Sequence, residues 1–86
     1  MKTIWKWEIN LGNGTATMPV GAEILTVQMQ NGEPQMWAIV DPTATTHHRN
    51  FHVVGTGHEV PERATYIGTY QQPELGLVWH LFEIEP

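Results

Sequence analysis

The fold is decided by residues 23–40, which read EILTVQMQNGEPQMWAIV. At the centre of this stretch, Asn31 and Gly32 are neighbouring residues that tolerate positive φ, as a two-residue type I′ turn requires. Residues of alternating character flank the turn on both sides, which is typical of two paired strands. The sequence therefore predicts an antiparallel hairpin with Asn31-Gly32 at its tip.

The register of this hairpin separates an apolar face from a mixed one. On the apolar face, Val27 opposes Met36 and Leu25 opposes Ala38. Trp37 lies on the other face, where its large indole either fills a second core layer or contacts a ligand or partner. Both interpretations of Trp37 stay open at this point.

The rest of the chain repeats short segments of period two between turn residues. Strands are expected at residues 3–9, 15–18, 50–54, 66–71 and 77–84. The first two are expected to pair with each other across a glycine-rich turn, and residues 43–48 form a polar loop. Both faces of 77–84 are apolar, which is typical of a central strand or of one covered by a partner. The prediction is one all-β domain over residues 1–86, a small antiparallel barrel or sandwich of six to seven short strands.

Composition excludes several classes of function. The 86 residues carry a formal net charge of −5 and only four Lys and Arg, too few for the basic surface that binds duplex nucleic acid. Cys is absent, so no disulfide, zinc thiolate or Cys nucleophile is available. No apolar stretch approaches the ~20 residues that span a bilayer, and the first residues lack the apolar run of a signal peptide. We therefore expect no membrane segment and a cytoplasmic location.

Five histidines are a high share of so short a chain, yet their spacing fits no metal motif. His48 and His52 share one face of an extended strand but lie ~13 Å apart, too far to hold one ion. Ser is absent, and no Thr has a basic partner in a recognised motif. We therefore expect that the protein is not an enzyme and that it binds neither a metal ion nor a cofactor.

The segment 54–58, read VGTGH, is the most suggestive local sequence. Its glycines could form a backbone concavity whose N–H groups collect anions, or a bend where a strand leaves its sheet. In an acidic protein, phosphate would be held by such amides, a Thr hydroxyl, a His and the nearest Arg, while an aromatic ring stacks on a base. The expected ligand is a small nucleotide-type anion. The predicted ligand-binding residues are Arg49, Gly55, Thr56, Gly57, His58 and Trp37.

Several stretches of the chain match a known family. They are KTIWK at 2–6, MPVGAEILTVQ at 18–28, NG at 31–32, WAIVDP at 37–42, VGTGH at 54–58, YIGT at 66–69 and LVWHLFE at 77–83. The chain thereby resembles a family of short phage-encoded proteins of uncharacterised function that open with Lys-Thr-Ile-Trp-Lys. The resemblance implies a phage or prophage gene whose product acts in the cytoplasm of the infected bacterium. It implies no catalytic residue.

Two functions fit these expectations. One is a non-catalytic accessory protein that sequesters a small anionic signal of host defence, such as a nucleotide. The other is an adaptor or inhibitor that blocks a host or phage protein, which the acidic charge would suit if the partner is basic. A core this small gains from additional burial, so a homo-oligomer, first of all a symmetric dimer, is expected.

Overall fold

The computed structural model describes residues 1–9 and 14–86, and this part of the chain is mostly β-strand. The strands are β1 (Thr3–Glu8), β2 (Thr15–Pro19), β3 (Glu23–Gln30), β4 (Glu33–Val40), β5 (Thr46–Gly55), β6 (Ala64–Gln72) and β7 (Leu77–Ile84). A single turn of 3-10 helix, η1 (Pro73–Leu75), joins β6 to β7. Among the described residues, no helix is long and apolar enough to cross a bilayer.

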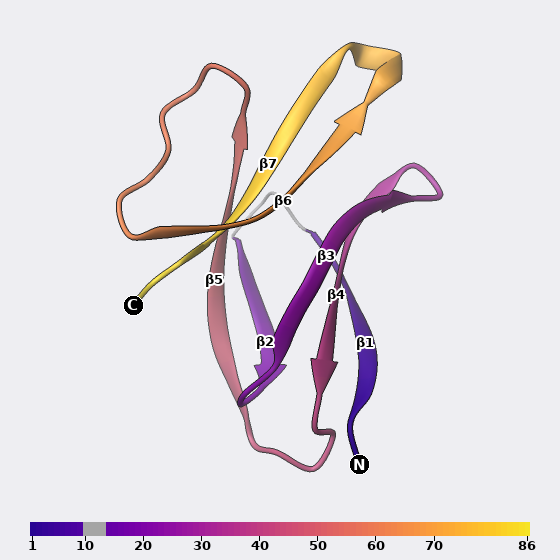
Figure 1. Cartoon of the computed structure of the whole chain (residues 1–86), viewed down its shortest axis with the longest axis vertical. Helices are drawn as coiled ribbons and strands as arrows, with labels where there is room; N and C mark the ends of the chain where they lie inside the picture. The colour runs from indigo at the N-terminus through magenta and orange to yellow at the C-terminus, as the bar shows by residue number, and fades with distance from the viewer. Residues whose placement is uncertain (10–13) are drawn as a thin grey trace.

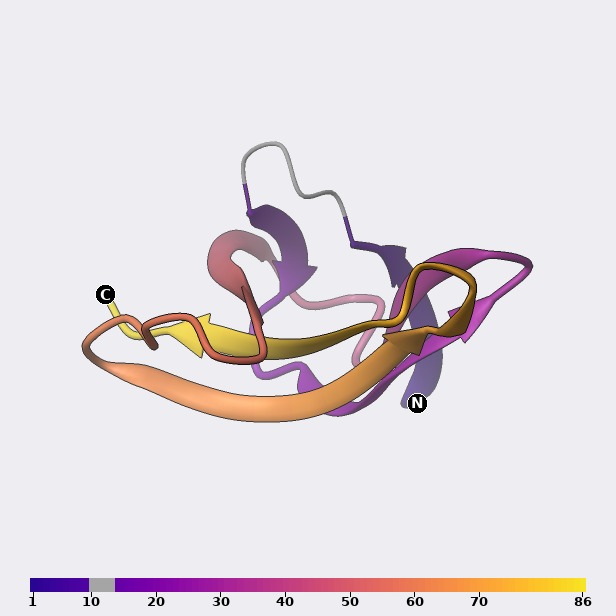
Figure 2. The same ribbon diagram turned by 90° about the horizontal axis from the view of Figure 1, so that it is seen from above.

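The strands form two antiparallel sheets that pack as an open sandwich (Figure 1, Figure 2). One sheet has the order β1-β4-β3, and the other has the order β2-β5-β7-β6. β7 is a central strand, which was one of the two alternatives that the apolar character of both its faces indicated. The all-β prediction is confirmed. Of its two alternatives, barrel and sandwich, the sandwich is the one observed, because the two sheets do not close into a barrel.

The first two strands belong to different sheets, so the predicted pairing of residues 3–9 with 15–18 is wrong. β1 pairs with β4, where Trp5 faces Ala38 and Trp7 faces Met36. β2 pairs with β5, and its Met18 is fully buried between the sheets. Each strand therefore covers a different side of the core. In this division Trp7 of β1 and Ala16 of β2 both pack against the core.

The hairpin of β3 and β4 is confirmed. Asn31 and Gly32 both have positive φ, at 52° and 80°, and Val27 lies opposite Met36. Further from the tip the register departs from the prediction.

A β-bulge at Leu25 shifts the pairing so that Ile24, rather than Leu25, lies opposite Ala38. The predicted pair of Leu25 with Ala38 is therefore wrong. Because the bulge adds one residue to β3, Ile24 packs against the core and Leu25 turns outward, where it is 47% exposed.

The core lies between the two sheets and is held at both long edges of the sandwich. Its buried members are Met18, Ala22, Val27, Met36, Ala38, Val40, Tyr70 and Leu81. At one edge β3 packs on β6, where a Cβ atom on Gly68 would lie 2.7 Å from Cγ1 of Val27. At the other edge the Trp7 indole N–H donates to the Thr17 carbonyl over 3.0 Å and ties β1 to β2.

β5 is longer than predicted. It begins at Thr46, inside the expected polar loop 43–48, because residues 46–50 pair with β2. Strand geometry then fixes the side chains of this segment, which alternate between the core side and the outer side of the sheet. His48 and His52 consequently share the outer side, as their spacing predicted.

Candidate functional site

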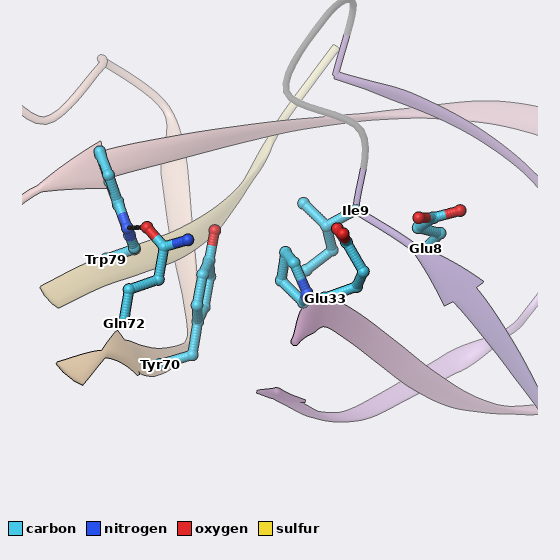
Figure 3. Close-up of a pocket in the computed structure, with 7 residues that line it drawn as sticks. Glu8, Ile9, Glu33, Tyr70, Gln72 and Trp79 are labelled. Atoms are coloured by element: carbon cyan, nitrogen blue, oxygen red, sulfur yellow. Dashed lines mark hydrogen bonds between the residues drawn. The ribbon is translucent and has the colours of Figure 1, made fainter. Parts of the chain in front are cut away.

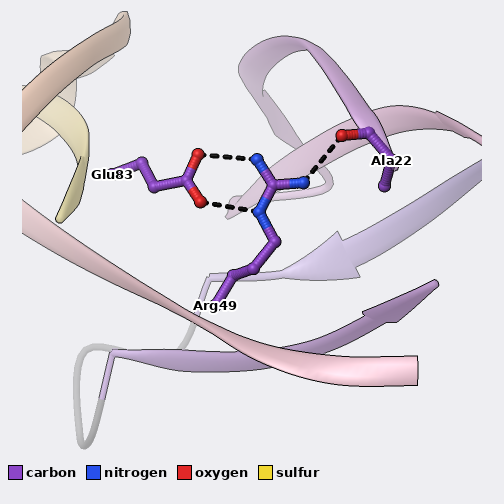
Figure 4. A network of polar contacts seen from close by, with 3 residues as sticks. All are labelled: Ala22, Arg49 and Glu83. Atoms are coloured by element: carbon purple, nitrogen blue, oxygen red, sulfur yellow. Dashed lines mark hydrogen bonds and ion pairs between the residues drawn. The ribbon is translucent and has the colours of Figure 1, made fainter. Parts of the chain in front are cut away.

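Arg49 lies between the sheets and is bonded on all three of its nitrogens (Figure 4). Its Nε and Nη2 each donate to a carboxylate oxygen of Glu83 over 2.6 Å, and Nη1 donates to the Ala22 carbonyl over 2.7 Å. These hydrogen bonds to Glu83 raise the pKa of the guanidinium above its usual value. With its side chain only 18% exposed, Arg49 acts as a cross-strand tie rather than an open anion-binding group.

The turn Gly55–His58 uses two of its four backbone N–H groups in hydrogen bonds within the chain. The His58 N–H donates to the Gly55 carbonyl over 3.0 Å, and the Thr56 N–H donates to the Val78 carbonyl over 3.2 Å. Gly57 has a positive φ of 91°, which suits this tight turn. The arrangement resembles the bend at a strand end more than a concavity of exposed amides.

The predicted ligand-binding residues lie in three separate places. Arg49 is six positions before Gly55 on β5, about 20 Å away along the strand. Trp37 is half-buried on the outer side of the other sheet, where its register partners are Lys6 and Thr26. The structure therefore brings neither Arg49 nor Trp37 to the Gly55–His58 turn.

A more coherent group of polar and aromatic residues covers the outer side of the four-stranded sheet, which we call the histidine face. Its members by strand register are Thr15, Thr17, His48, Asn50, His52, Val54, Val78, His80, Phe82, Ile84, Ala64, Tyr66, Thr69 and Gln71. None of these strand positions is Asp, Glu, Lys or Arg. The strands of this face therefore carry no acidic side chain, although the whole chain has a net charge of −5.

His80 is the centre of a chain of hydrogen bonds across this face. Thr69 Oγ1 lies 3.0 Å from its Nδ1 and 2.6 Å from the Tyr66 hydroxyl, and Thr56 Oγ1 lies 2.8 Å from its Nε2. One direction satisfies every member: Tyr66 donates to Thr69, Thr69 donates to Nδ1, Nε2–H donates to Thr56, and Thr56 donates to the Val78 carbonyl at 3.4 Å. The chain fixes the imidazole and the phenol in place.

Tyr66, Phe82 and His52 form a row across three neighbouring strands. The rings of Tyr66 and Phe82 meet edge to face, with centroids 5.7 Å apart and planes at 65°. Tyr66 is 57% exposed, so much of its ring remains open to solvent. His52 pairs with Phe82 through the backbone and is exposed, and its imidazole makes no hydrogen bond with any residue that the structure describes. Two strand spacings separate the Cα atoms of Tyr66 and His52, about 10 Å.

Sequence reasoning missed this face because its members come from four strands whose order was unknown. The alternation of Val78, His80, Phe82 and Ile84 on one side of the last strand was its visible part. If the register of the hairpin of β6 and β7 had been predicted, Tyr66 and Thr69 would have been assigned to the same side as His80 and Phe82. The structure also gives His80 two Thr hydroxyl partners, although no sequence motif links them. Within the described part of the chain, no three His, Asp or Glu residues cluster as metal ligands.

These features define the class: a small open β-sandwich with an uncharged, aromatic and histidine-rich sheet face. The chain belongs to a family described as a domain of unknown function (DUF7352), whose model matches residues 1–86. This agrees with the expected membership in an uncharacterised family, whereas phage origin stays a prediction. No curated protein and no solved structure matches the chain.

Proposed function

We propose that this protein is a non-catalytic binding protein that holds a small nucleotide-type anion on its histidine face. The observation that carries the proposal is the row of Tyr66, Phe82 and His52 on a sheet surface whose strand positions lack acidic residues. Elsewhere the acidic chain repels phosphate, so an anion would be attracted to this face more than to its surroundings.

The base of such a ligand would stack on Tyr66. The Tyr66 ring is exposed, its hydroxyl is hydrogen-bonded to Thr69, and the ring packs edge to face with Phe82. Because these contacts already hold the side chain, little side-chain freedom would be lost on binding. Stacking of a base on an aromatic side chain contributes about 1–3 kcal/mol. The sheet face thus offers a preorganised platform.

The phosphate would then lie near His52. The roughly 10 Å between the Cα atoms of Tyr66 and His52 spans the length of a nucleotide from base to phosphate. The imidazole of His52 has both ring nitrogens available among the described residues, whereas His48, about 13 Å further along the strand, lies too far away to bind the same phosphate. The His52 ring N–H can donate a hydrogen bond to the phosphate, which the distant Arg49 does not reach.

Catalysis is not part of this proposal, although Thr56 lies within hydrogen-bond distance of His80. In the directional chain described above, the Nε2–H group of His80 donates a hydrogen bond to the Thr56 hydroxyl. An imidazole in that tautomer is not arranged to remove a proton from the hydroxyl. The pair therefore serves to position the ring.

A second candidate function is the adaptor or inhibitor of another protein. The observation that favours it is the outer side of the three-stranded sheet, where Ile4 is 56% and Leu25 is 47% exposed beside Trp37 and Ile39. Exposed apolar side chains grouped on one face often mark a protein interface. The same face is where we expect two copies of this chain to form a dimer, and an adaptor function would require a host protein to replace or extend that contact.

The resemblance to phage proteins supplies the biological setting of the proposal: sequestration of a nucleotide signal in the infected bacterium. The test is native mass spectrometry of protein purified from cells, followed by calorimetry with AMP and with adenosine. A retained nucleotide, or binding of AMP tighter than adenosine, is expected. If neither nucleotide nor nucleoside binds, while one host protein co-purifies at fixed stoichiometry, the adaptor function replaces this one.

A further inference from the structure

A cavity of about 430 Å³ opens at one end of the sandwich, away from the histidine face. It lies where β1 ends, β4 begins and β6 ends, and it is lined by Glu8, Ile9, Glu33, Pro34, Tyr70, Gln72 and Trp79. Figure 3 shows Tyr70, Gln72 and Trp79 on one side of it and Ile9, Glu8 and Glu33 on the other. Tyr70 and Trp79 are register partners on the inner side of their sheet, so this site is separate from the nucleotide surface proposed above.

Tyr70 is the first sign that the cavity takes a ligand. Its side chain belongs to the core and the residue is only 5% exposed, yet among the described residues none bonds to its hydroxyl. No polar side-chain atom of the described residues is both sealed from solvent and without a partner, so the hydroxyl opens into the cavity, where water or a ligand can complete its hydrogen bonds. Burial also raises the pKa of Tyr70, so its phenol stays neutral and can both donate and accept.

Trp79 forms a fixed wall of the same cavity. Its indole N–H donates to Gln72 Oε1 over 2.7 Å (Figure 3). Its benzene edge lies against Gly55, where a Cβ atom would come 3.3 Å from Cζ3, and that same Cβ position is 3.7 Å from Nδ1 of His58. The indole is thus held from both ends before any ligand arrives.

The charges at the cavity have one sign. Glu8 and Glu33 line it, and among its described lining residues there is no Lys, Arg or His. A phosphate would be repelled here. A cation would be attracted by the carboxylates and by the electron-rich faces of an indole and a phenol.

We propose that this cavity binds a small organic cation that carries N–H donors, a guanidinium or a primary ammonium group. The aromatic pair, Tyr70 and Trp79, would contact its flat or apolar part. The Tyr70 hydroxyl would accept one hydrogen bond, and the Glu33 carboxylate would accept another from the side facing solvent. A guanidinium is the better fit because it is planar and weakly hydrated.

The test is titration of the intact protein with methylguanidinium chloride, followed by NMR through the indole N–H of Trp79. Saturable shifts are expected there, whereas urea, a neutral molecule of similar shape, and sodium chloride should give none. Tyr70→Phe keeps the packed ring and removes the hydroxyl, and it should weaken binding about tenfold, the effect of one hydrogen bond to a charged group.

Glu33→Gln is a second variant that does not endanger folding, because Glu33 is exposed. It should also weaken binding, while the matched exposed control Glu74→Gln on η1 should not. The proposal is overturned if methylguanidinium and urea shift the indole equally, or if Glu33→Gln and folded Tyr70→Phe bind like the parent protein. AMP added first should leave the titration unchanged. Competition between the two would contradict the assignment of separate sites.

Discussion

Gly68 of β6 lies directly against Val27 of β3, so that a Cβ atom on Gly68 would come within 2.7 Å of Val27 Cγ1. The two residues belong to different sheets, and their contact lies at the edge of the sandwich where β3 packs on β6. A side chain at position 68 would separate the sheets or displace a buried valine.

We therefore expect Gly68→Ala to destabilise the protein by about 1–3 kcal/mol, the usual effect of overpacking a core. Urea unfolding measures the change. Val27→Ala alone should also destabilise, by leaving a cavity, but the double variant should be more stable than the sum of the two losses predicts. Additive losses would contradict direct contact between the two positions.

Removing one partner of the Arg49–Glu83 pair should destabilise the fold without a specific effect on ligand binding. Both side chains are partly buried, at 18% and 24% exposed, so solvent screens the pair and we expect a loss of about 1–3 kcal/mol for Arg49→Ala or Glu83→Gln. Lys2→Ala, at an exposed cation, is the control. If folded Arg49→Ala retains full stability and loses AMP binding, the guanidinium contacts the ligand after all.

Nucleotide binding should depend on Tyr66 and His52. Tyr66→Leu is expected to weaken AMP binding by about 1–3 kcal/mol, or about 5- to 150-fold, because the stacking platform is lost. His52→Gln should weaken it too, since the imidazole beside the phosphate is lost.

The control for His52 is His47→Gln on the same strand. His47 is also exposed, but it faces the other side, opposite Met18. Calorimetry with AMP compares the variants. Equal effects of the His47 and His52 substitutions would place the ligand elsewhere.

Stability at high pH should depend on Tyr70. Burial raises its pKa, so the folded state holds the phenolic proton more tightly than the unfolded chain does. The resulting stability is fully present below the unfolded tyrosine pKa of about 10 and is lost as pH rises from there towards the higher pKa of the folded state. Tyr70→Phe should flatten the fall of unfolding free energy in that range. An unchanged slope would show that the ring does not titrate from a buried environment.

The outer side of the three-stranded sheet is expected to form the contact between two copies of the chain. Leu25→Glu places a charge among its exposed apolar residues and should shift the protein to a monomer in light scattering. Leu75→Glu is the matched control, because Leu75 is 63% exposed but lies on η1. A parent protein that is monomeric at high concentration would remove this interface.

The features of this fold that depend on residues close together in the sequence could be predicted from the sequence. The Asn31-Gly32 turn fixed the hairpin, and the apolar faces of residues 77–84 marked a central strand. The bulge at Leu25 could not be predicted, because it depends on which of two adjacent apolar residues the opposite sheet accepts. Arg49 was assigned to a ligand because a guanidinium binds phosphate well. Its carboxylate partner Glu83 could not be predicted, because it is 34 positions away in the sequence. The sheet order that places β5 beside β7, and so joins Arg49 to Glu83 and His52 to Phe82, is a property of the whole chain.

The separation of β1 and β2 into different sheets has a consequence for how the protein assembles. Hairpins such as β3–β4 join neighbours in sequence and can form early, whereas β1 must wait for β4 and β2 must wait for β5. During synthesis, β1 and β2 would each stay unpaired until a strand from a later part of the chain has been made. Until they dock, Trp5, Trp7 and Met18 are without their cover, and refolding followed by tryptophan fluorescence should take milliseconds to seconds rather than microseconds. Residues 3–19 are therefore open to aggregation for longer than a strand that pairs within a hairpin.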